Sequence, residues 1–162
     1  MTTVEKTAQH AGFVVEWRDG FRIGVDQIDA EHRHLFVLVK ALNVHNVQDT
    51  LGELLDYVVT HFTHEQALME SSGFPDFHQH LALHESFSAQ VAEFLSTGSE
   101  WSDERIQDLR RFLNKWLVGH ILTHDLRFGR WYIEQRRDAA VRITAPATTH
   151  KVGWFDRLLG RG

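Results

Sequence analysis

Apolar side chains recur every three to four residues along four long stretches of this chain, the spacing that places them on one face of an α-helix. The first predicted helix begins at Asp26 or Asp29, either of which can cap it, and runs to about Asn46. Its apolar stripe holds Ile28, Leu35, Val39 and Leu42. The preceding residues 13–25 predict an irregular arm in which two aromatic side chains are buried, Trp17 and Phe21.

Three further stretches show the same periodicity and have recognisable start and stop signals. A glycine commonly ends a helix, and serine or aspartate commonly begins one. The predicted bounds are Asp49 or Thr50 to the Ser71-Ser72-Gly73 stop, Phe77 to Thr97-Gly98, and Ser102 or Asp103 to Asp138.

Four amphipathic helices joined by short loops predict an all-α fold, an antiparallel up-down four-helix bundle with an irregular N-terminal arm and a C-terminal tail. The chain has only two prolines, Pro75 and Pro146, and both fall in predicted connections. Because proline is the strongest helix breaker, this scarcity favours long helices. We place the bundle domain in residues 1–138 and assign residues 139–162 to a linker and a short amphipathic segment.

Composition narrows the function classes. The 162 residues are 43% hydrophobic and 24% charged, which is typical of one globular domain. The net charge of −5 does not favour binding to nucleic acid or to an anionic membrane. Cysteine is absent, which excludes disulfides, iron–sulfur clusters and cysteine-ligated zinc. No signal peptide or membrane-spanning run is found, so we expect a cytoplasmic protein.

Histidine and carboxylate residues lie on the apolar stripes of all four predicted helices. They occur as Asp29-x-x-His32, His61-x-x-x-Glu65, His80-x-x-x-His84 and His120-x-x-x-x-Asp125. Residues four apart share a helix face, so both members of such a pair can reach one centre. Five imidazoles with two of these three carboxylates suit a pair of metal ions where no thiolate is available. The pattern therefore predicts a dinuclear metal site inside the bundle.

A core histidine bonded to a carbonyl is the commoner explanation of any single such residue, because an unpaired buried imidazole costs about 1–3 kcal/mol. That explanation is hard to extend to all four stripes. The weak point is the last pair, since five residues leave His120 and Asp125 about 140° apart on an ideal helix. Spacing alone favours His124 as the partner of His120. A local π-bulge or a long reach would be needed to turn Asp125 inward.

Ligand type limits the metal to iron, manganese, copper or zinc. Zincin chemistry is not indicated, because no His-Glu-x-x-His motif occurs. A ferritin-like di-iron site is not supported either, since it needs a Glu-x-x-His on each of two helices and only Glu31-x-x-His34 fits.

The last twelve residues carry four apolar side chains at helical spacing: Trp154, Phe155, Leu158 and Leu159. So short a helix is not stable alone in water. The segment therefore either folds back onto the bundle or docks on another protein.

These motifs resemble those of the hemerythrins, in particular the single-domain bacterial ones. The matching stretches cover roughly residues 13–132: Ile28–Phe36, His61–Met69, Phe74-Pro75 with His80-x-x-x-His84, Trp116–Asp125, and, in the arm, Trp17 with Ile23-Gly24-Val25. With seven ligand positions in order, the resemblance is highly specific.

The resemblance implies a di-iron centre that binds oxygen. His80, His84 and His120 would hold one iron, and His32 and His61 the other. Glu65 and Asp125 would bridge the two irons, with an oxo or hydroxo group as the third bridge. The two-histidine iron would keep the open position for dioxygen. The resemblance thus selects Asp125 over His124.

Reversible oxygen binding needs a small dry cavity, and the candidates for its wall are Leu35, Trp116, Leu117 and Ile121. Two positions depart from the family pattern. Gln66 replaces a glutamate, and we expect it to lie on the surface without effect. Phe128 stands where a tyrosine is common, which removes a hydroxyl that could tune the metal from outside its ligands. The remaining histidines are expected on the surface: His10, His34, His45, His64, His78, His124 and His150.

Three functions follow in order of preference. The first is oxygen binding for storage, delivery or scavenging. The second is an oxygen or redox sensor, or an interaction module, that acts through the C-terminal segment. The third is a di-iron peroxidase or oxidase, which ranks last because no acid–base residue is apparent beside the ligands.

Overall fold

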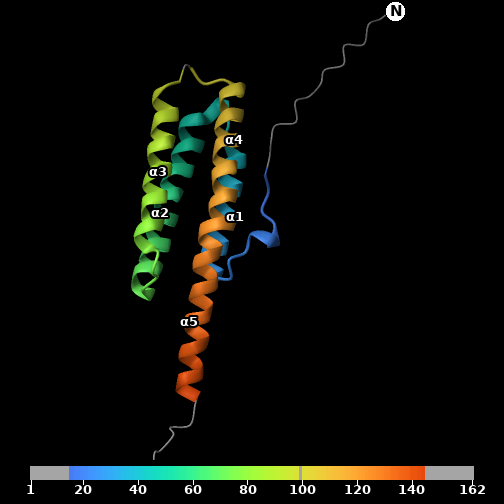
Figure 1. Ribbon diagram of the computed structural model, residues 1–162. Helices are drawn as coiled ribbons and strands as arrows, with labels where there is room; N and C mark the ends of the chain where they lie inside the picture. Colours follow the sequence, from blue (N-terminus) through green and yellow to red (C-terminus); the bar gives the residue numbers. More distant parts are fainter. Residues whose placement is uncertain (1–14, 99, 145–162) are drawn as a thin grey trace, which may run out of the picture.

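The structure, a computed structural model, describes residues 15–98 and 100–144. Its main elements are α1 (Asp26–Ala41), α2 (Val47–Ser72), α3 (Phe77–Ser96), α4 (Asp103–His120), the π-helix η3 (Ile121–Asp125) and α5 (Leu126–Thr144), with 3-10 turns η1 (Asp19–Phe21) and η2 (Val44–Asn46). Helix α1 packs against α2 and α4, and α2 packs against α3 (Figure 1). The predicted all-α four-helix bundle is confirmed.

The fourth predicted helix is α4, η3 and α5 in unbroken succession. His120, Ile121 and Leu126 all keep right-handed helical backbone angles across the two junctions. At its start, the Ser102 hydroxyl accepts a hydrogen bond from the Arg105 backbone N–H at 3.1 Å, which confirms the serine cap.

This column continues to Thr144, so the predicted linker is wrong for residues 139–144. No proline or glycine interrupts the sequence there, and alanine and arginine favour helix. From Glu134 to Thr144 every side chain is exposed, and this end of α5 projects beyond the other helices (Figure 1). The rest of the tail, including the Trp154–Leu159 segment, lies outside the described residues.

The other helix ends follow the sequence closely. Gly73 ends α2 in the left-handed conformation (φ 73°), where glycine has no side chain to strain, and the Phe74 N–H returns to the Met69 carbonyl at 3.0 Å. Helix α1 ends at Ala41, earlier than predicted, because η2 forms separately.

Asp29 does not cap α1. Its two oxygens accept the N–H groups of Ile23 and Gly24 at 2.8 and 3.1 Å, which fastens the arm to the bundle.

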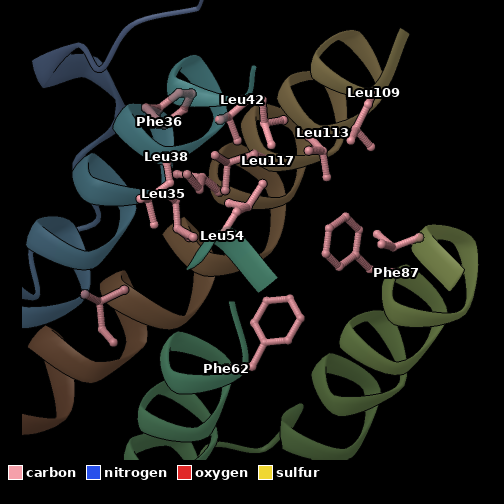
Figure 2. Packing of buried hydrophobic residues seen from close by; sticks show 14 of the residues in the cluster. Leu35, Phe36, Leu38, Leu42, Leu54, Phe62, Phe87, Leu109, Leu113 and Leu117 are labelled. Atoms are coloured by element: carbon pink, nitrogen blue, oxygen red, sulfur yellow. The ribbon is translucent and has the colours of Figure 1, made fainter. Parts of the chain in front are cut away.

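The buried apolar core includes side chains from α1, α2, α3, α4 and α5. Figure 2 shows Phe62 of α2 and Phe87 of α3 facing the leucines of α1 and α4. The arm aromatics Trp17 and Phe21 are partly buried rather than fully so, and both pack on Phe36. In the part of the chain that is described, no helix is both long and apolar enough to cross a membrane.

Gly129 of α5 allows the arm to lie close. A Cβ added there would overlap the carbonyl oxygen of Ile23, whereas one added at Gly52 of α2 would meet nothing within 4 Å. We therefore expect Gly129→Ala to destabilise the fold by about 1–3 kcal/mol through overpacking. Gly52→Ala, the matched control, should gain up to about 1 kcal/mol from helix propensity. Urea unfolding measures both, and equal gains in the two variants would contradict the packing of the arm.

Candidate metal centre

The bundle brings all seven predicted ligand positions into one buried cluster. All seven residues are buried, and none is more than 5% exposed. The cluster has two groups that share one carboxylate, and within each group the potential ligand atoms lie within 4.8 Å of one another. The larger group is Glu65, His80, His84, His120 and Asp125, and the smaller is His32, His61 and Glu65.

Each helix supplies its side chains through its own periodicity. Helix α1 provides His32, α2 provides His61 and Glu65 four residues apart, and α3 provides His80 and His84 at the same step. On the α4–η3–α5 column the interval is five residues, from His120 to Asp125. The π-helix bridges it: the Leu126 N–H bonds to the Ile121 carbonyl, an i to i+5 bond that aligns residues five apart. Asp125 is fully buried, while His124 is only half-buried.

Three imidazole nitrogens converge in the larger group. The Nε2 atoms of His80, His84 and His120 are separated pairwise by 3.1, 3.1 and 3.2 Å. Metal–nitrogen bonds are about 2.0–2.1 Å long, and adjacent ligands of an octahedral ion then lie about 3 Å apart. Three neutral imidazoles with one N–H each cannot fill such a triangle with hydrogen bonds. The spacing fits three ligands on one face of a metal ion.

The two carboxylates lie between the groups. Asp125 has Oδ2 at 3.1 Å from His32 Nε2 and Oδ1 at 3.0 Å from His120 Nε2, so its two oxygens face opposite sides. Glu65 has Oε2 at 3.2 Å from His80 Nε2. Its Oε1 is buried without a hydrogen-bond partner, and Glu65 also belongs to the smaller group. Each carboxylate therefore lies between the two groups, where it can contact both.

The cluster shifts the protonation of its members strongly. Burial and the Asp125 carboxylate raise the pKa of Glu65, but hydrogen bonds with His80 and His84 outweigh them and lower it to about 2. The pKa of Asp125 also lies well below its usual range, because contacts with His120, His32 and His80 overcome the effect of burial. Burial lowers the pKa of His84 to about 4. Burial lowers the pKa of His80 too, but Asp125 and Glu65 raise it to about 9.

Two ionised carboxylates in a dry interior need positive charge close by. Nδ1 of His32 and Oε1 of Glu65 have no hydrogen-bond partner among the described residues, and the Asp125 oxygens lie close to His32 and His120 without well-formed hydrogen bonds. Such atoms are costly unless something else binds them. Five imidazoles, two carboxylates and the buried atoms without hydrogen-bond partners fit a pair of divalent or trivalent cations. The residues present therefore suit iron.

Two polar contacts outside the cluster were not anticipated from the sequence. Glu31, buried on α1, accepts from His61 Nδ1 at 2.8 Å and from His64 Nδ1 at 2.7 Å. Its bond to His61 fixes that ring with Nε2 toward the cluster. Glu31 directly precedes His32 in the sequence, but nothing in helical spacing pairs it with His61 on another helix.

Gln66 is the second such contact. The expectation that it lies on the surface without effect is wrong, because it is half-buried with its amide 3.1 Å from His84 Nδ1. If His84 binds metal through Nε2, its Nδ1 carries a proton, and the amide oxygen of Gln66 must accept it.

Aromatic rings pack on the cluster from the core side. Phe62 stacks on His84 with ring centres 3.7 Å apart, and Trp116 stacks on His120 at 4.3 Å. Phe128 is fully buried but packs against Phe74, Trp131 and Tyr132, with no ring contact to the cluster in the described part of the chain.

Most of the histidines expected on the surface are found there. His34, His45, His64 and His78 are exposed, His124 is half-buried, and His10 and His150 lie outside the described residues. His64 differs from the rest because its ring bonds to Glu31.

Comparison with known proteins agrees with this geometry. The hemerythrin HHE cation binding domain matches residues 23–132, more than half of the chain. The chain belongs to the hemerythrin family. It is 33% identical over 156 residues to a bacteriohemerythrin of Stenotrophomonas maltophilia (strain R551-3), covering 90% of this chain and 95% of that protein. It is also 33% identical over 112 residues to hemerythrin subunit alpha of Lingula anatina, covering 69% of this chain and 90% of the subunit.

A crystal structure of wild-type hemerythrin has the same fold. It matches with a TM-score of 0.64 and 29% identity, over 73% of this chain and 97% of that one. The bacterial relative covers much more of this chain than the Lingula subunit does. The alignment with the bacterial relative therefore extends beyond the bundle, whereas the alignment with the Lingula subunit is shorter.

The pKa of His80 leads to a test of the cluster's charge. Its ordinary value is 6.5 and its folded value is about 9, so the folded state holds this proton more tightly than the unfolded chain. The resulting stabilisation is complete below pH 6.5 and is lost as the pH rises through 9. We expect the metal-free hemerythrin, prepared with a chelator, to lose about 1–3 kcal/mol of stability across this window.

Urea unfolding at a series of pH values measures this loss. His80→Gln should flatten the profile, while His45→Gln, at an exposed position, should leave it unchanged. A flat profile in the unsubstituted protein would show that the carboxylates do not hold a proton on His80.

Proposed function

We propose that this hemerythrin binds dioxygen reversibly at a non-haem di-iron centre, for oxygen storage, delivery or scavenging. The ligands we assign are His80, His84 and His120 to one iron and His32 and His61 to the other, with Glu65 and Asp125 bridging. The observation that carries the proposal is the placement of Asp125, whose oxygens lie 3.1 Å from His32 and 3.0 Å from His120. One carboxylate that contacts both histidine groups is what a dinuclear centre requires.

A bound pair of ferrous ions would supply the two electrons that oxygen takes up on binding and returns on release. The protein would fix the positions of the ligand side chains and leave one coordination position open. The smaller group contributes fewer side chains than the larger one, so the open position belongs on the side of His32 and His61. Glu31 keeps the His61 ring in one tautomer, which leaves Nε2 free to bind.

The proposed oxygen pocket is apolar. Leu35, Trp116 and Leu117 line a cavity of about 20 Å³ whose other walls are also apolar, and Ile121 is fully buried nearby in sequence. A small cavity without polar groups stays dry. Water and protons are thereby kept from the site, which favours release of oxygen over loss of peroxide. Phe128 lies in a separate aromatic cluster, so we propose that its effect on the centre is exerted through packing.

We assign no enzymatic turnover to the site. Glu31 and His64 lie beside the cluster behind the His61 ring, and His124 lies at its outer edge, with its ring centre 5.4 Å from that of His120. The cytoplasm is the proposed compartment, on the sequence argument, and cell fractionation tests it.

A sensor or interaction module is the second candidate, and the exposed end of α5 favours it. Eleven consecutive exposed residues, from Glu134 to Thr144, lead from the bundle toward the C-terminal segment. An isolated helix of this length is marginal in water, so a contact there would add stability. A protein partner held by Trp154, Phe155, Leu158 and Leu159 belongs to this second proposal.

Anaerobic reduction followed by exposure to air tests the main proposal. We expect two irons per chain and an oxygenated visible spectrum that disappears under vacuum and returns with air through several cycles. Metal analysis and absorption spectroscopy measure both. Conversion to a ferric form that cannot be re-oxygenated would reject reversible binding and favour the sensor.

Replacement of Asp125 and His124, one at a time, tests the bridge. Asp125→Ala removes a fully buried carboxylate that faces three of the five imidazoles, so we expect it to lose most of the iron. His124→Ala is the matched control from the same π-turn and should keep nearly all of it. Iron content per folded chain is the measurement, and equal retention would mean that Asp125 is not a ligand.

A further inference from the structure

The free end of α5 carries an exposed stripe on one side of the helix. This α5 stripe consists of Tyr132, Arg136, Ala139, Ala140 and Ile143, whose spacing places them on one helix face. Tyr132 is half-buried and the other four are exposed, with Ile143 at 84%. A helix is held mainly by the packing of its amphipathic face. The exposure of these residues leaves that face open to another segment.

The α5 stripe is shallow in its middle. Ala139 and Ala140 have the smallest side chains on it, while Arg136 lies against Tyr132. The arginine Nη1 donates to the tyrosine hydroxyl at 2.9 Å, and its guanidinium carbon lies 5.4 Å from the ring centre. Helices pack closely where large side chains of one face small side chains of the other. The stripe therefore fits a helix that carries bulky apolar residues.

A segment of this kind follows in the same chain. Residues 151–162, which lie outside the described residues, carry Trp154, Phe155, Leu158 and Leu159 at helical spacing. As a helix these twelve residues would be about 18 Å long, and the eleven exposed residues at the end of α5 extend about 16 Å. The segment and the exposed end of α5 therefore match in length.

The connection between them suits an antiparallel return. Helix α5 ends at Thr144, and residues 145–150 separate it from the segment. Pro146 opposes continuation of the helix, because a proline disfavours the helical conformation of the residue before it. Six residues lie within the range of about two to eight that joins neighbouring helices in bundles. In such a return, position 144 faces position 151 and position 140 faces position 155.

The flanking charges favour the same direction. Arg137 lies at one edge of the α5 stripe, and Asp156 lies at one edge of the apolar face of the segment. In an antiparallel pair these two edges meet, with the two residues within about one turn of each other. At the opposite edge Arg161 meets the uncharged Gln135. An ion pair between Arg137 and Asp156 therefore supports the antiparallel arrangement.

We propose that residues 151–162 fold back as a short antiparallel helix on the α5 stripe of the same chain, with Trp154 and Phe155 over Ala139 and Ala140. The apolar side chains of the segment are then shielded, and a protein partner can bind them only after the segment leaves the stripe. This inference does not rest on oxygen binding, so failure of the proposed function leaves it unaffected.

Tryptic cleavage after Arg157 tests whether the segment is covered. Ile143→Asp places a charge on the stripe and should speed this cleavage about tenfold, because protease reaches the released segment. Val141→Asp is the matched control: Val141 is also exposed, at 64%, and lies about 200° away around the helix. It should leave the cleavage rate unchanged. Mass spectrometry of timed digests of the full chain gives the rates, and equal rates in the two variants would overturn the proposal.

Introduced cysteines identify the occupant of the stripe, because the chain has none of its own. Arg137→Cys combined with Asp156→Cys should form a disulfide within one chain under mild oxidation. Asp138→Cys with Asp156→Cys is the control, since position 138 lies on the other side of α5, and it should remain reduced. Non-reducing electrophoresis and peptide mapping distinguish the products. A disulfide between two chains would mean that a second copy covers the stripe and would overturn the proposal, as would equal oxidation of both pairs or of neither.

Discussion

Two carboxylates buried among five imidazoles form the interaction on which this molecule depends. Glu65 and Asp125 are fully enclosed, and their low pKa values mean that they carry negative charge at neutral pH. Such charges are tolerated in an apolar interior only with a counter-charge in direct contact. The bundle meets this condition by converging one or two histidines from each helix on the pair. The cluster thus joins four helices through polar side chains in the interior of the bundle.

A single local irregularity completes the cluster. An unbroken α-helix would leave Asp125 on a different face from His120, and His124 would turn inward instead. The π-turn adds one residue to the helical repeat at this point and brings the carboxylate between the two histidine groups. It also leaves His124 at the edge, where it lines two outer cavities. The same turn thus places a carboxylate inside the cluster and a histidine in the wall of the outer cavities.

The two groups of the cluster have different surroundings. His32 and His61 are almost fully buried, with exposures of 0% and 1%. His120 lines a surface cavity that also has Lys115 and Trp116 in its wall, and His80 lines a second cavity next to His124. Glu31 contacts Nδ1 of His61, and the amide of Gln66 contacts Nδ1 of His84, so each group has one histidine held from outside the cluster.

Helical periodicity alone was enough to predict the four-helix bundle and the inward position of six of the seven cluster residues. The seventh, Asp125, was out of phase, because sequence spacing cannot say where a helix will take a π-turn; only packing against three other helices decides that. The contacts of Glu31 with His61 and of Gln66 with His84 join different helices and have no signature in one-dimensional spacing. The end of α5 was misplaced because alanine and arginine beyond Asp138 continue a helix that no stop signal interrupts. The sequence by itself therefore determined which residues face the core, since that depends on the period of one helix. The tertiary structure decided which atoms meet there, because that depends on the register between helices.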